Sequence, residues 1–233
     1  MTGTTRIDGI VFDKDGTLFD FHTTWSGWAR ALMEHMSDLH NVPVADIAQA
    51  IDFDLVTNRF LPGSVMISAN NRECAEALAK ALPGVSVDDV EEQMVASSAT
   101  AQLSPVVPLA AFLDGLSERG LKVGLMTNDS EFGARAHLEA AGVLDRFDFV
   151  AGYDSGHGHK PNADPLLAFA RLMGLTPARV VMVGDSTHDL IAARAAGMQS
   201  LGVLTGVAEA EELSHHADRV LPDIGHIPAW LDE

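Results

Sequence analysis

Apolar strand segments that alternate with helices run through the chain from about residue 105 onward. The segment Val180–Val183 is apolar throughout, as expected for a strand covered on both faces of a sheet. Proline near helix starts and glycine just past helix ends mark boundaries, as at Pro108 and Gly120. Helices separate further expected strands at 121–126, 147–150, 200–204 and 219–221. This alternation predicts an α/β fold with a doubly wound, Rossmann-like parallel sheet.

Residues 19–104 interrupt the alternation, because their patterns are helical. Ser86 is a typical N-cap, and Asp88 and Asp89 in the first turn suit the helix dipole. No segment here predicts a strand. Helices are expected at 24–39, 44–55, 68–82 and 86–101. The sequence therefore predicts an α/β core made of residues 1–18 and 105–233, and an inserted all-helical domain made of residues 19–104.

Composition restricts the partners and the compartment of this 233-residue chain. Its formal net charge of −18 disfavours nucleic acid and anionic membranes as partners. No apolar run approaches the ~20 residues that a membrane-spanning helix needs, and no signal-peptide pattern opens the chain. Cys74 is the single cysteine, which excludes an internal disulfide and fits a reducing cytoplasm. We expect a cytoplasmic monomer or homodimer, in which any phosphate site is built locally from lysines, backbone N–H groups and a cation.

The first expected strand ends in two aspartates. Ile10–Phe12 is apolar, and Asp13 and Asp15 follow it. Alternate strand residues point the same way, so both carboxylates could face one site at the carboxyl end of the strand. Parallel sheets bind ligands at that end, and two carboxylates there can divide nucleophilic and acid–base roles. An ordinary Asp-Gly turn is the alternative.

Other strand ends carry residues that suit phosphate and metal binding. Thr127 and Asn128 follow an expected strand, where a hydroxyl and free N–H groups can bind an anion. Lys160 stands in a glycine-rich loop and could neutralise a phosphoryl group. Asp185 and Asp189 suit a hard cation such as Mg²⁺. Helix caps and a solvated loop lysine are the alternatives, but together with the first strand these ends favour a phosphoryl-transfer site.

Two histidines in the same loop invite a zinc interpretation. His157 and His159 flank a glycine. Structural zinc sites need four ligands, and the sequence places no further cysteine or histidine at the required spacing. We interpret both as loop histidines.

The motifs, taken in order, resemble those of the haloacid dehalogenase-like hydrolase superfamily. They are Asp13-Lys14-Asp15-Gly16-Thr17-Leu18, Thr127-Asn128, Lys160-Pro161, and Gly184-Asp185 with Asp189. The helical insertion is similar to the mobile cap of phosphoglycolate phosphatase-like members. Lys14 departs from the pattern, since many relatives carry an apolar residue there, and the sequence leaves its orientation open. The resemblance implies a Mg²⁺-dependent phosphomonoesterase for a small phosphorylated metabolite, with 2-phosphoglycolate as one candidate.

The resemblance also implies a role for each matched residue. Asp13 would be the nucleophile that forms an aspartyl-phosphate, and Asp15 would be the general acid and base. The phosphoryl group would be bound by Thr127, Asn128 and Lys160. Mg²⁺ would be held by a carboxylate oxygen of Asp13, the backbone carbonyl of Asp15, and Asp185, with Asp189 in support.

Other functions stay open. A sugar phosphomutase would use the same residues, and a non-catalytic phosphate-sensing or phosphoacceptor module would share their chemistry. A dehalogenase is disfavoured because that branch lacks the second aspartate. Phosphonate hydrolysis would need a Schiff-base lysine in the insertion, where Lys80 is the only lysine. Arg59 and Arg72 in the insertion are candidate contacts for a substrate carboxylate, although a solvated helix face is the favoured interpretation.

Overall fold

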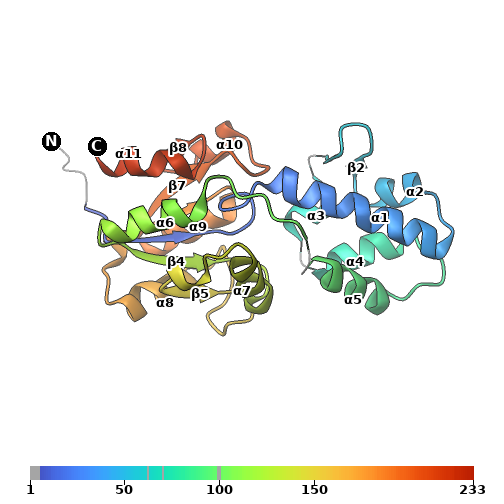
Figure 1. Ribbon diagram of the computed structural model, residues 1–233, viewed down its shortest axis with the longest axis horizontal. Coiled ribbons are helices and arrows are strands. Elements are labelled where there is room, and N and C mark those ends of the chain that lie inside the picture. Colours follow the sequence, from blue (N-terminus) through green and yellow to red (C-terminus); the bar gives the residue numbers. More distant parts are fainter. Residues whose placement is uncertain (1–5, 62, 70, 99–100) are drawn as a thin grey trace. The chain divides into compact units, whose positions relative to one another are not determined.

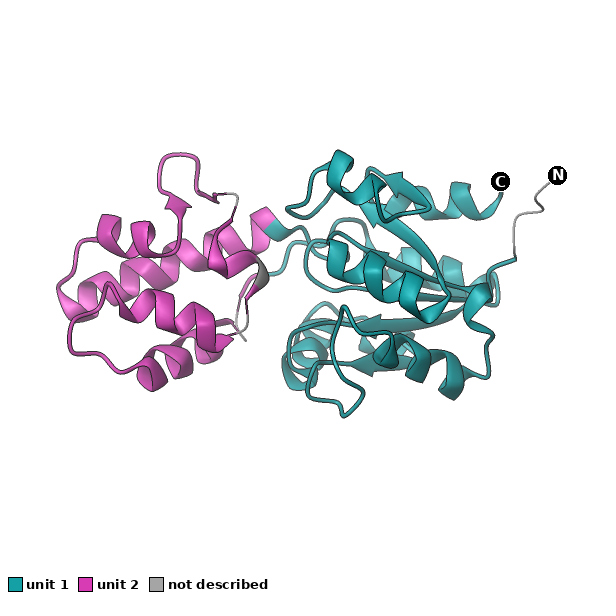
Figure 2. Ribbon diagram, turned by 180° about the vertical axis from the view of Figure 1, so that it is seen from behind, with its two compact units in different colours: residues 1–21, 103–233 teal, residues 22–102 magenta. Residues whose placement is uncertain are grey.

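A computed structural model describes residues 6–61, 63–69, 71–98 and 101–233 (Figure 1). The chain divides into two compact units (Figure 2). The core unit comprises residues 1–21 and 103–233, and the insertion unit comprises residues 22–102. In the part of the chain that is described, no helix combines the length and apolar character needed to cross a membrane.

A six-stranded parallel sheet forms the centre of the core unit. Its strands are β1 (Gly9–Phe12), β4 (Lys122–Met126), β5 (Phe149–Ala151), β6 (Val180–Gly184), β7 (Gln199–Val203) and β8 (Arg219–Leu221). The order across the sheet is β5-β4-β1-β6-β7-β8, and every neighbouring pair is parallel. This is the doubly wound order, in which the direction of strand succession reverses between β1 and β6. The fold class predicted for the core is confirmed.

Helices cover both faces of this sheet. They are α6 (Leu109–Glu118), α7 (Glu131–Ala140), α8 (Asp164–Met173), α9 (Thr187–Ala196), α10 (Ala210–Ser214) and α11 (Ile227–Leu231). Alternate residues of β1 point to opposite faces: Ile10 and Phe12 pack in a cluster with α6, α7 and α11, whereas Val11 packs in a second cluster with α8 and α9. Burial on both sides explains why β1 and β6 carry only apolar residues and glycine.

Helices dominate the insertion unit. They are α1 (Gly27–His40), α2 (Val44–Ala50), α3 (Val65–Ser68), α4 (Asn71–Ala79) and α5 (Val87–Ser98), and a π-helical turn at His22–Ser26 precedes them. The indole N–H of Trp28 on α1 donates to Ser97 Oγ on α5 at 3.0 Å. Residues 70, 99 and 100, which fall within expected helices, lie outside the described residues.

The prediction of an all-helical insertion is wrong at residues 53–60. There β2 (Phe53–Asp54) and β3 (Arg59–Phe60) form a two-stranded antiparallel sheet, and the helix expected over 44–55 ends at Ala50. The rings of Phe53 and Phe60 meet edge to face at 5.1 Å across the pair. Asp54 closes the turn by accepting hydrogen bonds from Val56 N at 2.8 Å and from the Thr57 hydroxyl at 2.7 Å. This local carboxylate bonding competes with a helix and favours the turn.

Candidate active site

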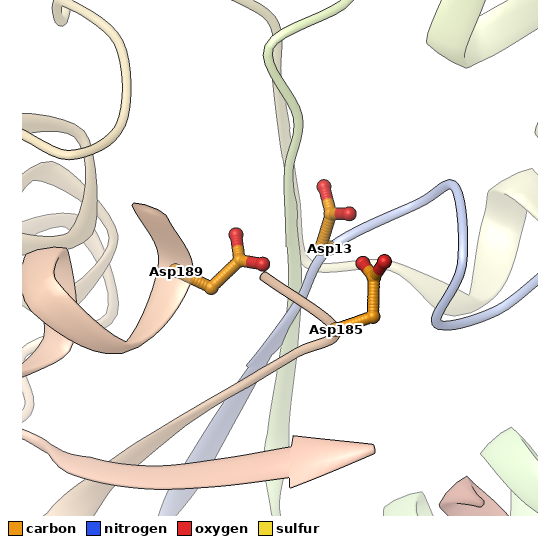
Figure 3. A group of neighbouring side chains, drawn as sticks. All are labelled: Asp13, Asp185 and Asp189. Atoms are coloured by element: carbon orange, nitrogen blue, oxygen red, sulfur yellow. The ribbon is translucent and has the colours of Figure 1, made fainter. Parts of the chain in front are cut away.

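Three buried aspartates meet where the sheet order reverses. Asp13 follows β1, Asp185 follows β6, and Asp189 lies in the first turn of α9. One carboxylate oxygen of each lies within 4.8 Å of the others, and Figure 3 shows the three side chains around a common space. Asp13 N donates to Val183 O at 2.9 Å, so the pairing of β1 with β6 continues to the first aspartate. The sheet itself therefore brings together residues 172 positions apart in the chain.

Lys160 connects two of these carboxylates. Its Nζ lies 2.6 Å from Asp13 Oδ1 and 2.6 Å from Asp189 Oδ1, and the side chain is buried. The side-chain amide of Asn128 holds the lysine backbone: Asn128 Nδ2 donates to Lys160 O at 2.9 Å, and Lys160 N donates to Asn128 Oδ1 at 3.0 Å. Asn128 thus ties the loop after β4 to the loop that carries the lysine.

A capping box fixes Asp189. Its Oδ2 accepts from Ser186 N at 3.1 Å and from the Ser186 hydroxyl at 2.7 Å. The chain reaches this helix start through Gly184, where an added Cβ would lie 2.2 Å from Asp189 Oδ2. The capping interpretation of Asp189 is therefore correct, and the same side chain also pairs with Lys160.

Asp185 packs against two glycines. Gly16 has a φ of 78°, and a Cβ there would lie 2.3 Å from Asp185 Oδ2. Gly206, which follows β7, lies against the same carboxylate, since its Cβ would lie 1.6 Å from Asp185 Oδ2. The hydroxyl of Thr205 donates to Gly16 O at 2.6 Å and holds the two loops together. Sequence reasoning missed Thr205 and Gly206, because a single Thr-Gly pair after a strand carries no specific signal.

Burial dominates the electrostatics of the site, and the neighbouring carboxylates add to its effect. Burial raises the pKa of Asp13 to about 7; Lys160 opposes this shift, and Asp189 adds to it. Burial and the neighbouring carboxylates of Asp13 and Asp189 raise the pKa of Asp185 well above its ordinary value. Burial would lower the pKa of Lys160, but Asp13 and Asp189 outweigh it and raise that pKa.

These shifts test whether the site fits a cation. Three carboxylates face one ammonium, so ionising all of them leaves excess negative charge in a buried place. Oxygen ligands in small number, with room left for phosphate oxygens, are the donor set that Mg²⁺ prefers. The residues present fit a divalent cation. The side chain of Asp15 is not part of this cluster of three aspartates.

Comparison with known proteins identifies the family. The profile of haloacid dehalogenase-like hydrolases matches residues 7–197. The chain belongs to the haloacid dehalogenase-like hydrolase family. It is 34% identical over 231 residues to phosphoglycolate phosphatase from Escherichia coli O157:H7, covering 89% of this chain and 86% of that protein. The predicted phosphoglycolate phosphatase-like branch is confirmed, and the chain is a hydrolase of the phosphatase type.

Solved structures of the family share the fold. A predicted phosphoglycolate phosphatase from Haemophilus somnus superimposes with a TM-score of 0.72 at 20% identity, covering 98% of this chain and 99% of that one. A candidate beta-phosphoglucomutase from Thermotoga maritima gives a TM-score of 0.76 at 19% identity, covering 97% and 99%. At these identities the likeness shows the architecture alone.

The first family motif also carries a buried lysine. Lys14 is fully buried, and its Nζ contacts Asp15 Oδ2 at 3.0 Å and Asp129 Oδ2 at 2.8 Å. Burial would lower the pKa of Lys14, but the carboxylates of Asp15 and Asp129 outweigh it and raise that pKa. Thr127, whose side chain is also buried, accepts from Asp129 N at 3.1 Å through Oγ1. The sequence leaves the orientation of the Lys14 side chain open. In the structure, its ammonium contacts both Asp15 and Asp129.

Within the insertion unit, the candidate arginines differ. Arg72 pairs with Asp88, and its Nη1 lies 3.0 Å from Glu91. Its charge therefore has acidic partners on a helix surface, as the solvated-face interpretation predicts. Arg59 is exposed on β3. Cys74 is buried, and burial raises the pKa of its thiol to about 11, which suits a small core residue and not a nucleophile.

Proposed function

We propose that this chain is a Mg²⁺-dependent phosphomonoesterase that hydrolyses a small phosphorylated metabolite through an aspartyl-phosphate on Asp13. One observation carries the proposal. Asp13, a buried carboxylate at the switch point of the sheet, touches Lys160 and stands beside Asp185 and Asp189. A carboxylate in contact with a fixed ammonium and next to a cation-binding group suits attack on a phosphate ester.

The reaction has two balanced steps. A carboxylate oxygen of Asp13 bonds to phosphorus while the bond from phosphorus to the ester oxygen breaks, and Asp15 gives the departing alcohol its proton. Water then attacks the phosphorus of the aspartyl-phosphate, Asp15 takes a proton from that water, and inorganic phosphate leaves with Asp13 restored. Lys160 and the hydroxyl of Thr127 bind the phosphoryl oxygens in both steps.

Asp13, the backbone carbonyl of Asp15, and Asp185 would hold the Mg²⁺, with Asp189 in support. When bound, the ion supplies positive charge that offsets the repulsion between the Asp13 carboxylate and the substrate phosphate. Family phosphatases of this kind generally use Mg²⁺.

The insertion unit would act as the cap that selects the substrate and excludes water during the reaction. The domain division that we propose, a core of residues 1–18 and 105–233 with a cap of residues 19–104, differs by two or three residues from the compact units. Cys74 is buried and forms no disulfide, which supports a reducing, cytoplasmic location.

The substrate that we propose first is 2-phosphoglycolate. Its support is the 34% identity to a phosphatase named for that substrate, over 89% of this chain. Release of inorganic phosphate from 2-phosphoglycolate and from a panel of phosphorylated sugars, with Mg²⁺ present, tests both the reaction and the substrate. A phosphomutase would instead move the phosphoryl group to a sugar hydroxyl and would require a bisphosphate for full activity.

A matched pair of variants accompanies this assay. Asp13→Asn should lower kcat by more than about 1,000-fold, as expected when a covalent nucleophile is removed. Asp145→Asn, at an exposed aspartate that pairs with Arg146, should leave kcat unchanged. Turnover by Asp13→Asn at the wild-type rate would overturn the proposed function.

A further inference from the structure

The buried ammonium of Lys14 lies within hydrogen-bond distance of three acceptors, one of which is Asp15. Its Nζ lies 3.0 Å from Asp15 Oδ2, 2.8 Å from Asp129 Oδ2 and 2.8 Å from His137 Nδ1. An ammonium has three N–H donors, and these three acceptors match them one to one. The lysine side chain has no exposed surface, whereas the Asp15 side chain is 21% exposed. The Asp129 side chain is 29% exposed, so both carboxylates reach solvent, while the ammonium of Lys14 and the ring of His137 are buried.

Backbone hydrogen bonds fix the residues on the Asp129 side of the cluster. Asp129 Oδ1 accepts from Ser130 N at 2.7 Å, and Asp129 N donates to Thr127 Oγ1 at 3.1 Å. His137 is buried on α7, a helix capped by the Ser130 hydroxyl, which accepts from Gly133 N at 3.1 Å. Asp129 thus comes from the loop before a capped helix, and His137 comes from the helix itself. Both therefore hold the ammonium of Lys14 in a fixed position.

The protonation pattern of the cluster follows from its donors. A lysine ammonium can only donate, so His137 Nδ1 accepts. The proton of the neutral imidazole is then on Nε2, and the ring adds no second positive charge to the cluster. The charge of Lys14 is shared between Asp15 and Asp129, and Asp129 also accepts a hydrogen bond from the backbone.

Stability alone is a poor reason for this arrangement. Burying an ammonium costs desolvation free energy, and apolar side chains of similar volume often replace buried ion pairs without loss of stability. A methionine could fill the space of Lys14, but it could not orient a carboxylate. An apolar residue at position 14 would supply none of the three contacts, and of the three partners Asp15 is the one with a role in the proposed reaction.

We propose that Lys14, braced by Asp129 and His137, is a positioning residue that fixes the carboxyl group of Asp15 for proton exchange with the leaving alcohol and the attacking water. This inference rests on the proposed function, because it assigns Lys14 a task in that reaction. Lys14 acts through Asp15 and does not touch the phosphoryl group.

Leaving-group dependence tests the assignment. Phenyl phosphate needs a proton on its departing oxygen, whereas 2,4-dinitrophenyl phosphate has a leaving group that departs as an anion. Lys14→Met should lower kcat/KM by about 100-fold for phenyl phosphate, in the range of general acid catalysis, and by less than about 3-fold for 2,4-dinitrophenyl phosphate. A merely structural role would lower both values by the same factor.

Three further variants complete the design. Lys122→Met removes an exposed lysine that pairs with Asp148, and it should change neither value. His137→Leu removes the acceptor at Nδ1 and should show the Lys14→Met pattern more weakly, whereas His137→Asn keeps an acceptor there and should restore most of the activity. If Lys14→Met does not fold, the comparison of His137→Leu with His137→Asn still tests the positioning role of Lys14.

The outcomes separate the two proposals. Equal loss for both substrates, or no loss, in folded Lys14→Met or His137→Leu overturns the positioning role and leaves the phosphatase intact. If the wild-type protein releases phosphate from neither aryl phosphate and from none of the phosphorylated metabolites, the proposed function itself fails.

Discussion

At the residue scale, the site is defined by buried, neighbouring carboxylates whose simultaneous ionisation is unfavourable. Asp13 has an ordinary pKa of 3.8 and a pKa of about 7 in the fold, because burial and Asp189 outweigh Lys160. Between these two values the folded protein binds a proton that the unfolded chain does not. Stability from this group is therefore present at low pH and is lost as the pH rises through about 7.

The direction of this pH dependence predicts how the effect of Mg²⁺ on stability changes with pH. The free energy of unfolding of the metal-free protein should fall between pH 5 and pH 8, and Mg²⁺ should raise the melting temperature more at pH 8 than at pH 5. At low pH, protons already neutralise the carboxylates that the ion would bind. Differential scanning calorimetry with and without Mg²⁺ measures both effects. Asp13→Asn should remove most of the pH dependence of the Mg²⁺ effect, and an equal Mg²⁺ effect at both pH values would contradict this account.

At the element scale, most of the core could be predicted because its strands are buried on both faces. The segment at 219–221 is β8 as expected, and Gly174 and Gly197 end their helices in the left-handed conformation, as their positions indicate. The hairpin at 53–60 could not be predicted, since two-residue strands show no alternation and their pairing depends on contact between Phe53 and Phe60. Short strands of this kind become visible only through tertiary contacts.

The same limit applies to the candidate site. Asp13, Thr127 and Asp185 could be named because each directly follows an apolar strand. The structure brings Asp13 and Asp185 together with Asp189 and with Lys160, which stands in a glycine-rich loop. Their roles remain predictions. The partners of Lys14 could not be named, because Asp129 and His137 lie 115 and 123 residues further along the chain. An Asp in the loop before a helix and a His in the last turn of that helix form no pattern that points to a distant lysine.

The link between the two loops at Asn128 gives an element-scale prediction. Asn128→Ala removes both hydrogen bonds to the Lys160 backbone, so the lysine loop should lose its fixed position. We expect kcat/KM to fall by about 10- to 100-fold, the range seen when support of a site is removed, with the melting temperature little changed. Asn162→Ala, at an exposed position of the same loop, is the matched control. A wild-type kcat/KM in Asn128→Ala would show that the hydrogen bonds between Asn128 and the Lys160 backbone have no part in catalysis.

At the scale of the whole molecule, net charge opposes the proposed substrate. The chain carries a formal charge of −18, and a phosphorylated metabolite is an anion. Long-range repulsion should slow the approach of the substrate, while the positive charge of Lys160 and a bound cation act only at short range.

Ionic strength tests this balance. With Mg²⁺ held saturating, kcat/KM should rise by about twofold or more as potassium chloride goes from low concentration to about 0.15 M, because salt screens the long-range repulsion. Steady-state phosphate release at a series of salt concentrations measures it. A steady fall of kcat/KM with salt would mean that attraction from the local site controls binding.

The central claim is a covalent bond between Asp13 and phosphorus, and trapping that bond tests it most directly. Asp15→Asn should slow the hydrolysis of the intermediate while 2,4-dinitrophenyl phosphate still forms it, since that leaving group needs no proton. After acid quenching and trypsin digestion, mass spectrometry should find one added phosphoryl group on the peptide of residues 7–14, and fragmentation should place it on Asp13 rather than Asp8. A phosphoryl group on another residue, or an unmodified peptide during turnover, would contradict the account.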